Sequence, residues 1–272
     1  MDGTGQLGAA LLLGLVQALT EFLPVSSSGH LVIIKSLFKV QETGITLEVV
    51  THVATTLAVL VYMRARIVGL VRAAAHKLAR PRAALAGQEA RDLRLLVLIV
   101  VGSVPAAILG VAISGHVEKL FENVVVTAAM LVVTGVFVLA TGKLARERTG
   151  LGFKQALGIG VAQAIAIIPG ISRSGSTVGT GLALGVNRRE AFEFSLLLSV
   201  PAVLGAAVFE AMGGRLGGDP VVVAAAGVTA FVAGYASIYL LFRAVVRHWF
   251  HLFGYYLIPV GILFVILASR SA

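Results

Sequence analysis

The sequence contains no cysteine, and only 13% of its 272 residues are charged. Without cysteine the chain can form neither a disulfide nor a catalytic thiolate. So few charges, with 58% hydrophobic residues, are typical of an integral membrane protein. The net charge of +9 does not indicate a nucleic-acid partner, because the basic residues lie between hydrophobic runs, where they report membrane orientation. The apolar run 7–19 also lacks the preceding basic segment of a signal peptide and is followed by Glu21, so we expect it in the mature protein.

Long and short apolar runs alternate along the chain. Six runs are long enough to span a membrane, and they cover about 47–63, 93–113, 124–141, 191–211, 221–242 and 252–268. Four shorter runs form two pairs around polar loops, at 7–19 with 31–38 and at 156–168 with 177–186. Irregular backbone at membrane depth is tolerated only inside protein or beside a water-filled cavity, so each pair predicts a re-entrant helix hairpin. The fold class predicted is an all-α polytopic membrane protein, a single membrane domain over 1–272 with six transmembrane helices and two re-entrant hairpins.

The two polar loops are related by an internal repeat. Six residues recur 146 positions later: Gly14, Gln17, Ala18, Ser26, Ser28 and Gly29 reappear as Gly160, Gln163, Ala164, Ser172, Ser174 and Gly175. This similarity predicts repeats at approximately 1–142 and 152–269. Each repeat holds one hairpin and three spans, and because three is an odd number the second repeat has inverted topology.

The basic residues indicate the orientation of this plan. The loops 64–92, 143–154, 187–189 and 243–250 fall on one face and hold 15 lysines and arginines, whereas the loops of the other face hold four. The positive-inside rule then places the first hairpin and both termini outside and the second hairpin on the cytoplasmic side. The basic segment 64–92 is expected to be a surface helix and linker.

Polar residues cluster where the first hairpin breaks. Gln17 and Glu21 lie on one helix face, four residues apart, and an intramembrane glutamate is by default a functional candidate; the alternative is an interfacial carboxylate near a helix end. Ser26, Ser27 and His30 follow in the loop. If the second half-helix begins here, Ser27 and His30 can hydrogen-bond, and a serine activated by a histidine is a nucleophile.

The second loop, residues 168–177, surrounds a guanidinium with hydroxyls. Arg173 lies among Ser172, Ser174, Ser176 and Thr177. An arginine at membrane depth costs roughly 2.5–3.5 kcal/mol, so it normally faces a cavity or an anion. A helix N-terminus after the break supplies free N–H groups, and the combination predicts a phosphate-binding site. The alternative is a Pro/Gly loop whose arginine reaches the membrane surface, which the existence of a second, related loop disfavours.

If the two loops meet, an anion-binding arginine faces a nucleophile and a proton carrier. This arrangement predicts phosphoryl transfer, in which catalysis is chiefly positioning and charge stabilisation. Glu21 could hold a divalent cation, but Mg²⁺ and Ca²⁺ take several oxygen ligands and Gln17 is neutral. Glu48 and Glu193, 145 positions apart, are interpreted as structural or interfacial, and His52 either lines the site or bonds to a neighbouring helix.

Three motifs resemble the signature of the undecaprenyl-diphosphate phosphatase, or bacitracin-resistance, family. They are Gln17-x-x-x-Glu21, Pro24-Val-Ser-Ser-Ser-Gly-His30 and Pro169-Gly-Ile-Ser-Arg-Ser-Gly-Ser-Thr177. The resemblance covers nearly the whole chain. It implies hydrolysis of undecaprenyl diphosphate to undecaprenyl phosphate and inorganic phosphate on the outer side of the bacterial inner membrane, which recycles the lipid carrier of peptidoglycan synthesis. It also implies dependence on Mg²⁺ or Ca²⁺, bacitracin resistance, contact with membrane lipids, and the capacity to form a homodimer.

On matching positions, the resemblance implies an active site of Glu21, Ser27, His30, Ser172, Arg173 and Thr177. The family pattern has Glu or Gln at position 17, so Gln17 fits, while His52 stands where the pattern has Gln. Attack by Ser27 and direct attack by water both remain open. The rival function is a polyprenyl-phosphate transporter or flippase, since inverted repeats with broken helices also build transporters. A type 2 phosphatidic acid phosphatase is set aside, because residues 174–185 contain neither the histidine nor the aspartate of that family.

Overall fold

The described residues of the computed structural model, 3–38, 45–82, 84–113, 123–145, 149–212 and 217–271, form helices and connecting loops. The one β-type contact printed within these ranges is an isolated bridge between Thr149 and Val186. Five helices are long and apolar enough to cross a membrane: α5 (Gly87–Ile113), α7 (Val124–Leu144), α10 (Arg188–Met212), α11 (Pro220–Val246) and α12 (Phe253–Ser271). The chain is therefore a multi-pass, all-helical membrane protein, as the sequence predicts.

The sixth predicted span is bent. Helix α3 (Ile45–Tyr62) covers the run 47–63, but it meets α4 (Arg64–Ala79) at an angle of 80°, so it counts as a sixth span only if the bent pair is one span. The break coincides with the change from an apolar to a basic sequence. As expected, the segment after residue 63 begins as a helix. Helix α5, however, begins at Gly87 rather than near residue 93, because Asp92 is buried there against Arg66 at 2.9 Å.

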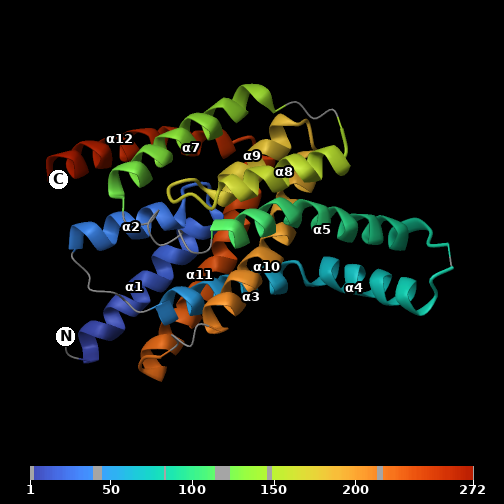
Figure 1. The fold of residues 1–272 in the computed structure, drawn as a ribbon, viewed down its shortest axis with the longest axis horizontal. Coiled ribbons are helices and arrows are strands. Elements are labelled where there is room, and N and C mark those ends of the chain that lie inside the picture. Colours follow the sequence, from blue (N-terminus) through green and yellow to red (C-terminus); the bar gives the residue numbers. More distant parts are fainter. Residues whose placement is uncertain are drawn as a thin grey trace.

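The four shorter apolar runs form two pairs of helices. Helix α1 (Gly3–Phe22) is followed by a short loop and α2 (Ser27–Phe38), and α8 (Phe153–Ile165) is followed by a loop and α9 (Arg173–Ala183). A single 3₁₀ turn, η1 (Phe250–Leu252), precedes α12. In Figure 1 the two loops between the paired helices lie in the middle of the molecule, surrounded by the longer helices.

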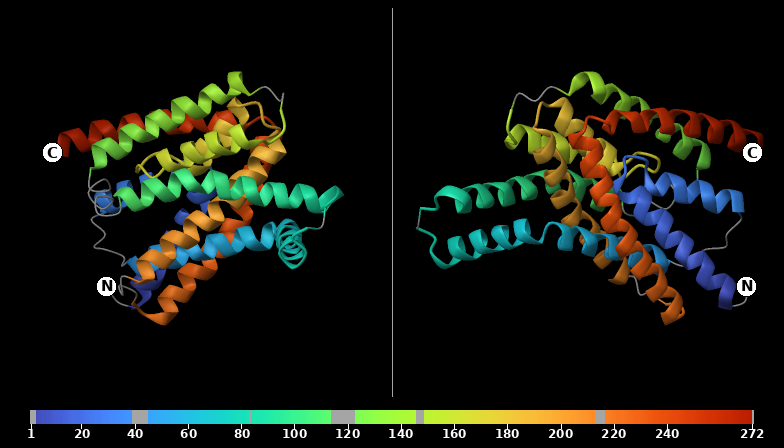
Figure 2. Two further views of the ribbon diagram at one scale, coloured as in Figure 1. Left: turned by 45° about the vertical axis from the view of Figure 1, so that its right-hand side comes forward. Right: turned by 180° about the vertical axis from the view of Figure 1, so that it is seen from behind.

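The main hydrophobic core lies where α1, α3, α10 and α11 meet. Its large buried side chains include Phe22, Val59, Phe192, Phe194 and Leu241. Helices α7 and α12 pack against each other along one edge, where Gly254 lies against the Gly135 carbonyl (Figures 1 and 2). Helices α5 and α12 leave most of their apolar side chains partly or fully exposed, as expected for surfaces that contact lipid.

Glycines at equivalent repeat positions allow two close helix contacts. Helix α1 packs on α11, with Gly14 against the carbonyl of Ala226, and α8 packs on α5, with Gly160 against the carbonyl of Gly102. Gly14 and Gly160 are separated by the 146-residue offset of the repeat. A Cβ at Gly14 would lie 2.5 Å from the Ala226 oxygen, so only glycine fits without a shift. Helices α1 and α8 thus dock on α11 and α5 through glycines in the same way.

The basic α4–α5 hairpin lies far from the outer ends of α1 and α12. The start of α1 and the end of α12 lie on one side of the molecule, and the α4–α5 hairpin projects from the opposite side (Figures 1 and 2). The hairpin carries the basic residues Arg64, Arg66, Arg72, Lys77 and Arg91. The basic segment and the termini are therefore at opposite ends of the fold.

Candidate active site

The loop between α1 and α2 is a tight turn held by serine. Ser26 has φ +67°, in the left-handed region that few side chains favour, and its hydroxyl accepts a hydrogen bond from the Gly29 N–H at 3.2 Å. The Ser26 and Ser28 hydroxyls lie 3.3 Å apart. These contacts cap the first turn of α2 and fix Ser27 at its start.

The loop between α8 and α9 is built in the same way. The Ser172 hydroxyl caps α9 by accepting from the Gly175 N–H at 3.1 Å and lies 3.2 Å from the Ser174 hydroxyl. Each of these contacts repeats one of the first loop, 146 residues later. Thr134 of α7 also holds the loop, because its hydroxyl donates to the Gly170 carbonyl and accepts from the Ser172 N–H. Both loops are therefore preorganised by backbone hydrogen bonds.

The two loops touch. The Ser174 hydroxyl donates to the Leu23 carbonyl at 3.0 Å, and a Cβ added to Gly29 would lie 3.3 Å from the Gly170 Cα. A Cβ at Gly29 would also lie 2.8 Å from Leu131 of α7. The expectation that the loops meet is thus fulfilled by the geometry, at a point enclosed by α7.

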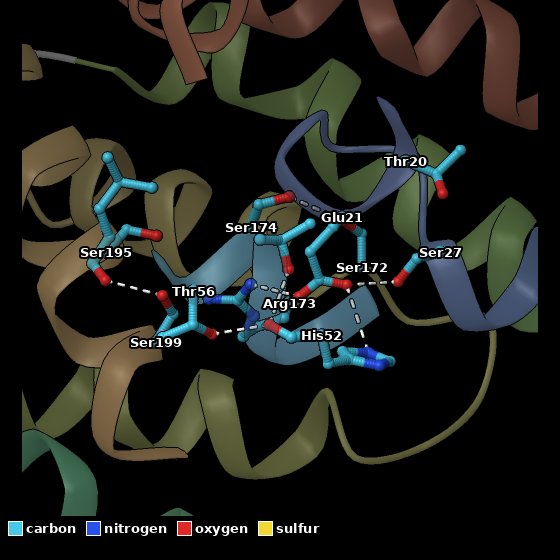
Figure 3. A network of polar contacts seen from close by, with 12 residues as sticks. Thr20, Glu21, Ser27, His52, Thr56, Ser172, Arg173, Ser174, Ser195 and Ser199 are labelled. Carbon is cyan, nitrogen blue, oxygen red and sulfur yellow. Dashed lines mark hydrogen bonds and ion pairs between the residues drawn. The ribbon is translucent and has the colours of Figure 1, made fainter. Parts of the chain in front are cut away.

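Glu21 lies at the centre of the residues that the loops bring together (Figure 3). It is only 9% exposed, and Arg173 donates to its Oε1 at 2.6 Å while Ser27 donates to its Oε2 at 2.7 Å. Gln17 donates to Oε2 at 3.1 Å, and His52 Nε2 lies 3.6 Å from the same oxygen. A buried carboxylate needs such partners, since an unpaired buried charge is strongly destabilising.

His30 is not bonded to Ser27, contrary to the sequence expectation. Its Nδ1 lies 2.9 Å from the Ser26 carbonyl and its Nε2 lies 2.8 Å from the Tyr256 hydroxyl, with the two rings stacked at 5.8 Å. Ser27 donates to Glu21 instead, because the carboxylate folds across the helix break. Tyr256 was not predicted, since it belongs to an apolar helix 226 residues away and carries no local signal.

Thr177, near the start of α9, has partners inside the protein. Thr177 is fully buried, donates to the Arg173 carbonyl at 2.8 Å and lies 2.6 Å from the Ser195 hydroxyl of α10. Ser176 is buried on α9. Ser195 was missed in the sequence, where an isolated serine in an apolar span is common. A role of Ser172, Ser174, Ser176 and Thr177 in binding substrate stays a prediction.

The remaining acidic candidates differ in their surroundings. Glu193 lies 3.0 Å from Arg189 and 4.0 Å from Arg66, which agrees with the structural interpretation. The backbone carbonyl of Glu48 lies 2.8 Å from His52 Nδ1 and so fixes the imidazole that faces Glu21. His52 thus lies beside Glu21 and also contacts Gln17 of the neighbouring helix α1, so its position agrees with both alternatives that the sequence left open.

The site offers oxygen atoms to a divalent cation but few negatively charged groups. Within the described ranges, no group of three or more acidic, histidine or cysteine side chains converges as a metal site would. Gln17 is 1% exposed, and its Oε1 is buried without a hydrogen-bond partner. An orphaned amide oxygen beside a carboxylate is suited to a hard cation whose other ligands come from a bound phosphate.

The fold and this site define a polytopic helical membrane protein in which a buried carboxylate bonds to a half-buried guanidinium and a half-buried serine hydroxyl where two helix breaks meet. Residues 10–263 match the family described as bacitracin resistance protein BacA. The chain is 38% identical over 274 residues to the undecaprenyl-diphosphatase of Desulforapulum autotrophicum, covering 96% of this chain and 98% of that protein. It is 36% identical over 282 residues to undecaprenyl-diphosphatase 2 of Streptomyces avermitilis, covering 97% and 95%. The chain therefore belongs to the BacA family.

Proposed function

We propose that this protein is a membrane phosphatase that hydrolyses undecaprenyl diphosphate to undecaprenyl phosphate and inorganic phosphate. The observation that carries the proposal is the bonding of Ser27 and Arg173 to the two oxygens of buried Glu21. Its support from comparison is membership of a family whose curated relatives are named undecaprenyl-diphosphatases. In this role the protein would recycle the lipid carrier of cell-wall synthesis and contribute to bacitracin resistance.

Ser27 is the nucleophile in the proposed reaction, and Glu21 receives its proton. The Ser27 hydroxyl already donates to Glu21 Oε2 at 2.7 Å, which is the geometry a general base requires. As the new bond from Ser27 Oγ to the terminal phosphorus forms, the bond from that phosphorus to the bridging oxygen breaks and undecaprenyl phosphate departs. Water then hydrolyses the phosphoserine and releases inorganic phosphate.

Arg173 stabilises the transferred phosphoryl group. A guanidinium carries five N–H donors in a planar fork, so Arg173 can keep its bond to Glu21 through Nη2 while other donors bind phosphate oxygens. Ser172, Ser174, Ser176 and Thr177 surround it at the start of α9, where free N–H groups favour an anion. Together they form the proposed phosphate-binding side of the site, opposite Gln17, Ser26 and Ser27.

His30 is assigned to the leaving-group side, as a proton carrier that Tyr256 and Ser26 orient. The Nδ1 contact with the Ser26 carbonyl requires a proton on that nitrogen, so Nε2 is the atom that exchanges a proton with Tyr256 or substrate. The same contact supports the strained backbone of Ser26, which positions Ser27.

A divalent cation, Mg²⁺ or Ca²⁺, would be held by Glu21 and the unpartnered amide oxygen of Gln17, with diphosphate oxygens completing its coordination. When bound, it would neutralise charge on the diphosphate. The protein residues position the two reacting groups without it, because Ser27 and Arg173 are both anchored to Glu21.

The membrane arrangement follows from the repeat. We assign α1–α2 and α8–α9 as re-entrant hairpins of an inverted repeat, supported by the equivalent docking of Gly14 and Gly160 and by the matching caps of Ser26 and Ser172. With the basic α4–α5 hairpin in the cytoplasm, the α1 start and α12 end face outside (Figure 2). In this arrangement we assign the site to the outer side of the bacterial inner membrane and the polyprenyl tail to apolar helix surfaces.

The deciding experiment measures phosphate release from undecaprenyl diphosphate by purified protein in detergent, with and without a chelator. We expect release that depends on added divalent cation and disappears in Glu21→Gln, where the proposed base and a proposed ligand of the cation are lost together. A polyprenyl-phosphate transporter would bind the lipid but release no phosphate. Binding without hydrolysis by the wild type, with cation supplied, would therefore contradict the proposal.

A further inference from the structure

His52 presents one ring nitrogen to the site in a fixed orientation. Its Nδ1 lies 2.8 Å from the Glu48 backbone carbonyl, and a carbonyl can only accept, so Nδ1 carries a proton there. The lone pair of the neutral ring is therefore on Nε2, which faces Gln17 and Glu21. Metal-binding histidines are oriented in this way, with the second ring nitrogen donating to a carbonyl or carboxylate.

His52 Nε2 forms a triangle with two other side-chain atoms. The Gln17 amide nitrogen is 2.9 Å from His52 Nε2 and 3.1 Å from Glu21 Oε2, and the latter two atoms are 3.6 Å apart. Ligands bound at about 2.0–2.2 Å around one ion lie about 3.0–3.5 Å from each other. The triangle thus has the dimensions of one face of a coordination shell.

The Gln17 amide supplies the second, independent observation. Its N–H₂ group bridges two acceptors, a carboxylate oxygen and an imidazole nitrogen, while its Oε1 is buried with no partner. Rotating the amide by half a turn would exchange the two atoms and place the orphaned oxygen within the triangle. With the amide rotated, all three corners of the triangle would be metal-binding atoms, and a cation held by them would give the unpaired oxygen a partner.

We propose that His52 Nε2 is a ligand of the divalent cation in this protein, together with Glu21 Oε2 and Gln17 Oε1. Oε1 of Glu21 stays with Arg173, so the two carboxylate oxygens serve different partners. An imidazole nitrogen in a mixed nitrogen and oxygen site favours transition-series ions, so Mn²⁺ and Co²⁺ bind more tightly than Mg²⁺ or Ca²⁺. The assignment rests on the proposed function only for the use of the ion, since the ligand atoms are present without substrate.

The test uses Mn²⁺ alone, bound to purified full-length protein in detergent without substrate. Electron spin-echo envelope modulation detects a ¹⁴N nucleus bound to Mn²⁺, and growth on ¹⁵N-histidine changes that signal only if the nitrogen is histidine. We expect the signal in the wild type, its replacement on labelling, and its loss in His52→Gln. The matched control is His76→Gln, since His76 lies on the exposed α4 beside Glu89 and should leave the signal unchanged.

Calorimetry with each metal gives the second readout. Because loss of an outer partner of a metal ligand already weakens binding about 10–100-fold, His52→Gln should weaken Mn²⁺ binding at least about tenfold. The same substitution should change the affinity for Ca²⁺ much less than the affinity for Mn²⁺. A Mn²⁺ spectrum without nitrogen coupling in the wild type, absence of Mn²⁺ binding, or a histidine signal that persists in His52→Gln would each overturn the assignment. If His52→Gln fails to fold, the labelled wild type still shows whether a histidine binds Mn²⁺, and His30→Gln, which should keep the signal, tests the other histidine of the site.

Phosphate release with Mg²⁺, measured on the same preparations, separates the two proposals. Hydrolysis by a wild type that shows no nitrogen coupling would remove His52 as a ligand and keep the phosphatase. A nitrogen-coupled Mn²⁺ site in a protein that releases no phosphate would keep the ligand and remove the phosphatase.

Discussion

Ser27 and Arg173 lie 146 residues apart, at equivalent positions of the repeat, and each donates to a different oxygen of Glu21. The serine bond to Oε2 is 2.7 Å and the arginine bond to Oε1 is 2.6 Å. Helices α2 and α9 therefore begin at residues 146 positions apart that differ in chemistry. In the proposed mechanism α2 contributes the nucleophile and α9 the cation, and the single carboxylate of Glu21 aligns them.

The first prediction concerns the planar shape of the Arg173 guanidinium. Arg173→Lys keeps the charge but loses the planar fork that can bind Glu21 and phosphate together, so we expect kcat to fall by about 10²-fold or more. The measurement is steady-state phosphate release. Arg189→Lys is the matched control, because Arg189 is 73% exposed and pairs with Glu193 far from Glu21. Near-normal turnover of Arg173→Lys would place the phosphate-binding site elsewhere.

The long apolar runs were sufficient to predict five spans, because each run is longer than the apolar segment of an ordinary loop or β-strand. The break after Met63 was predictable from the change from an apolar to a basic sequence, but the 80° angle between α3 and α4 was not, since neither proline nor glycine marks it. The early start of α5 was hidden by charges such as Asp92, which reads as a loop residue until Arg66 and Gln88 are seen bonded to it. Asp92 is buried inside a helix because Arg66 and Gln88 bond to it, and the local sequence does not reveal these partners.

The sequence indicated which residues lie close together in the candidate site better than it indicated which hydrogen bonds they form. The repeat indicated that the loops of Glu21 and Arg173 correspond, and the structure brings these two residues together. The pairing of Ser27 with His30 was wrong because spacing along the chain does not reveal that Glu21 turns back toward α2. The partners Tyr256 and Ser195 lie on distant helices, where sequence gives no information on which side chain faces the site.

A second prediction tests the packing of the first hairpin. Gly14→Ala would push a methyl group to 2.5 Å from the Ala226 carbonyl, so we expect about 1–3 kcal/mol of destabilisation from overpacking. Gly8→Ala, on the same helix, meets nothing within 4 Å and should be neutral or stabilising by about 0.5–1 kcal/mol. Thermal unfolding of both variants in one detergent provides the comparison. Equal midpoints for the two would show that α1 does not dock closely on α11.

A third prediction concerns orientation in the membrane. The absence of native cysteine allows single cysteines to be placed at Gly217, near the start of α11, and at Ala84, between α4 and α5. An impermeant thiol reagent added to intact cells should label Gly217→Cys and should label Ala84→Cys only after the cells are opened. The reverse pattern would place the basic hairpin outside and invert the proposed topology.

The last prediction separates an enzyme from a carrier through Ser27. Loss of its hydroxyl in Ser27→Ala removes the proposed nucleophile but leaves the Arg173–Glu21 ion pair, so hydrolysis should fall to background while diphosphate binding stays within about threefold, which is less than one neutral hydrogen bond.

His30→Ala should reduce the rate by about 10²–10⁴-fold, as removal of a positioned acid–base group does. Ser103→Ala is the serine control, because the Ser103 hydroxyl bonds to the Ile99 carbonyl within α5. Phosphate release and lipid-diphosphate binding are measured for all variants in the same detergent. Full hydrolysis by Ser27→Ala would favour direct attack by water and keep the phosphatase. If Ser27→Ala instead altered only the movement of lipid across a vesicle membrane, and the wild type released no phosphate, the protein would be a carrier.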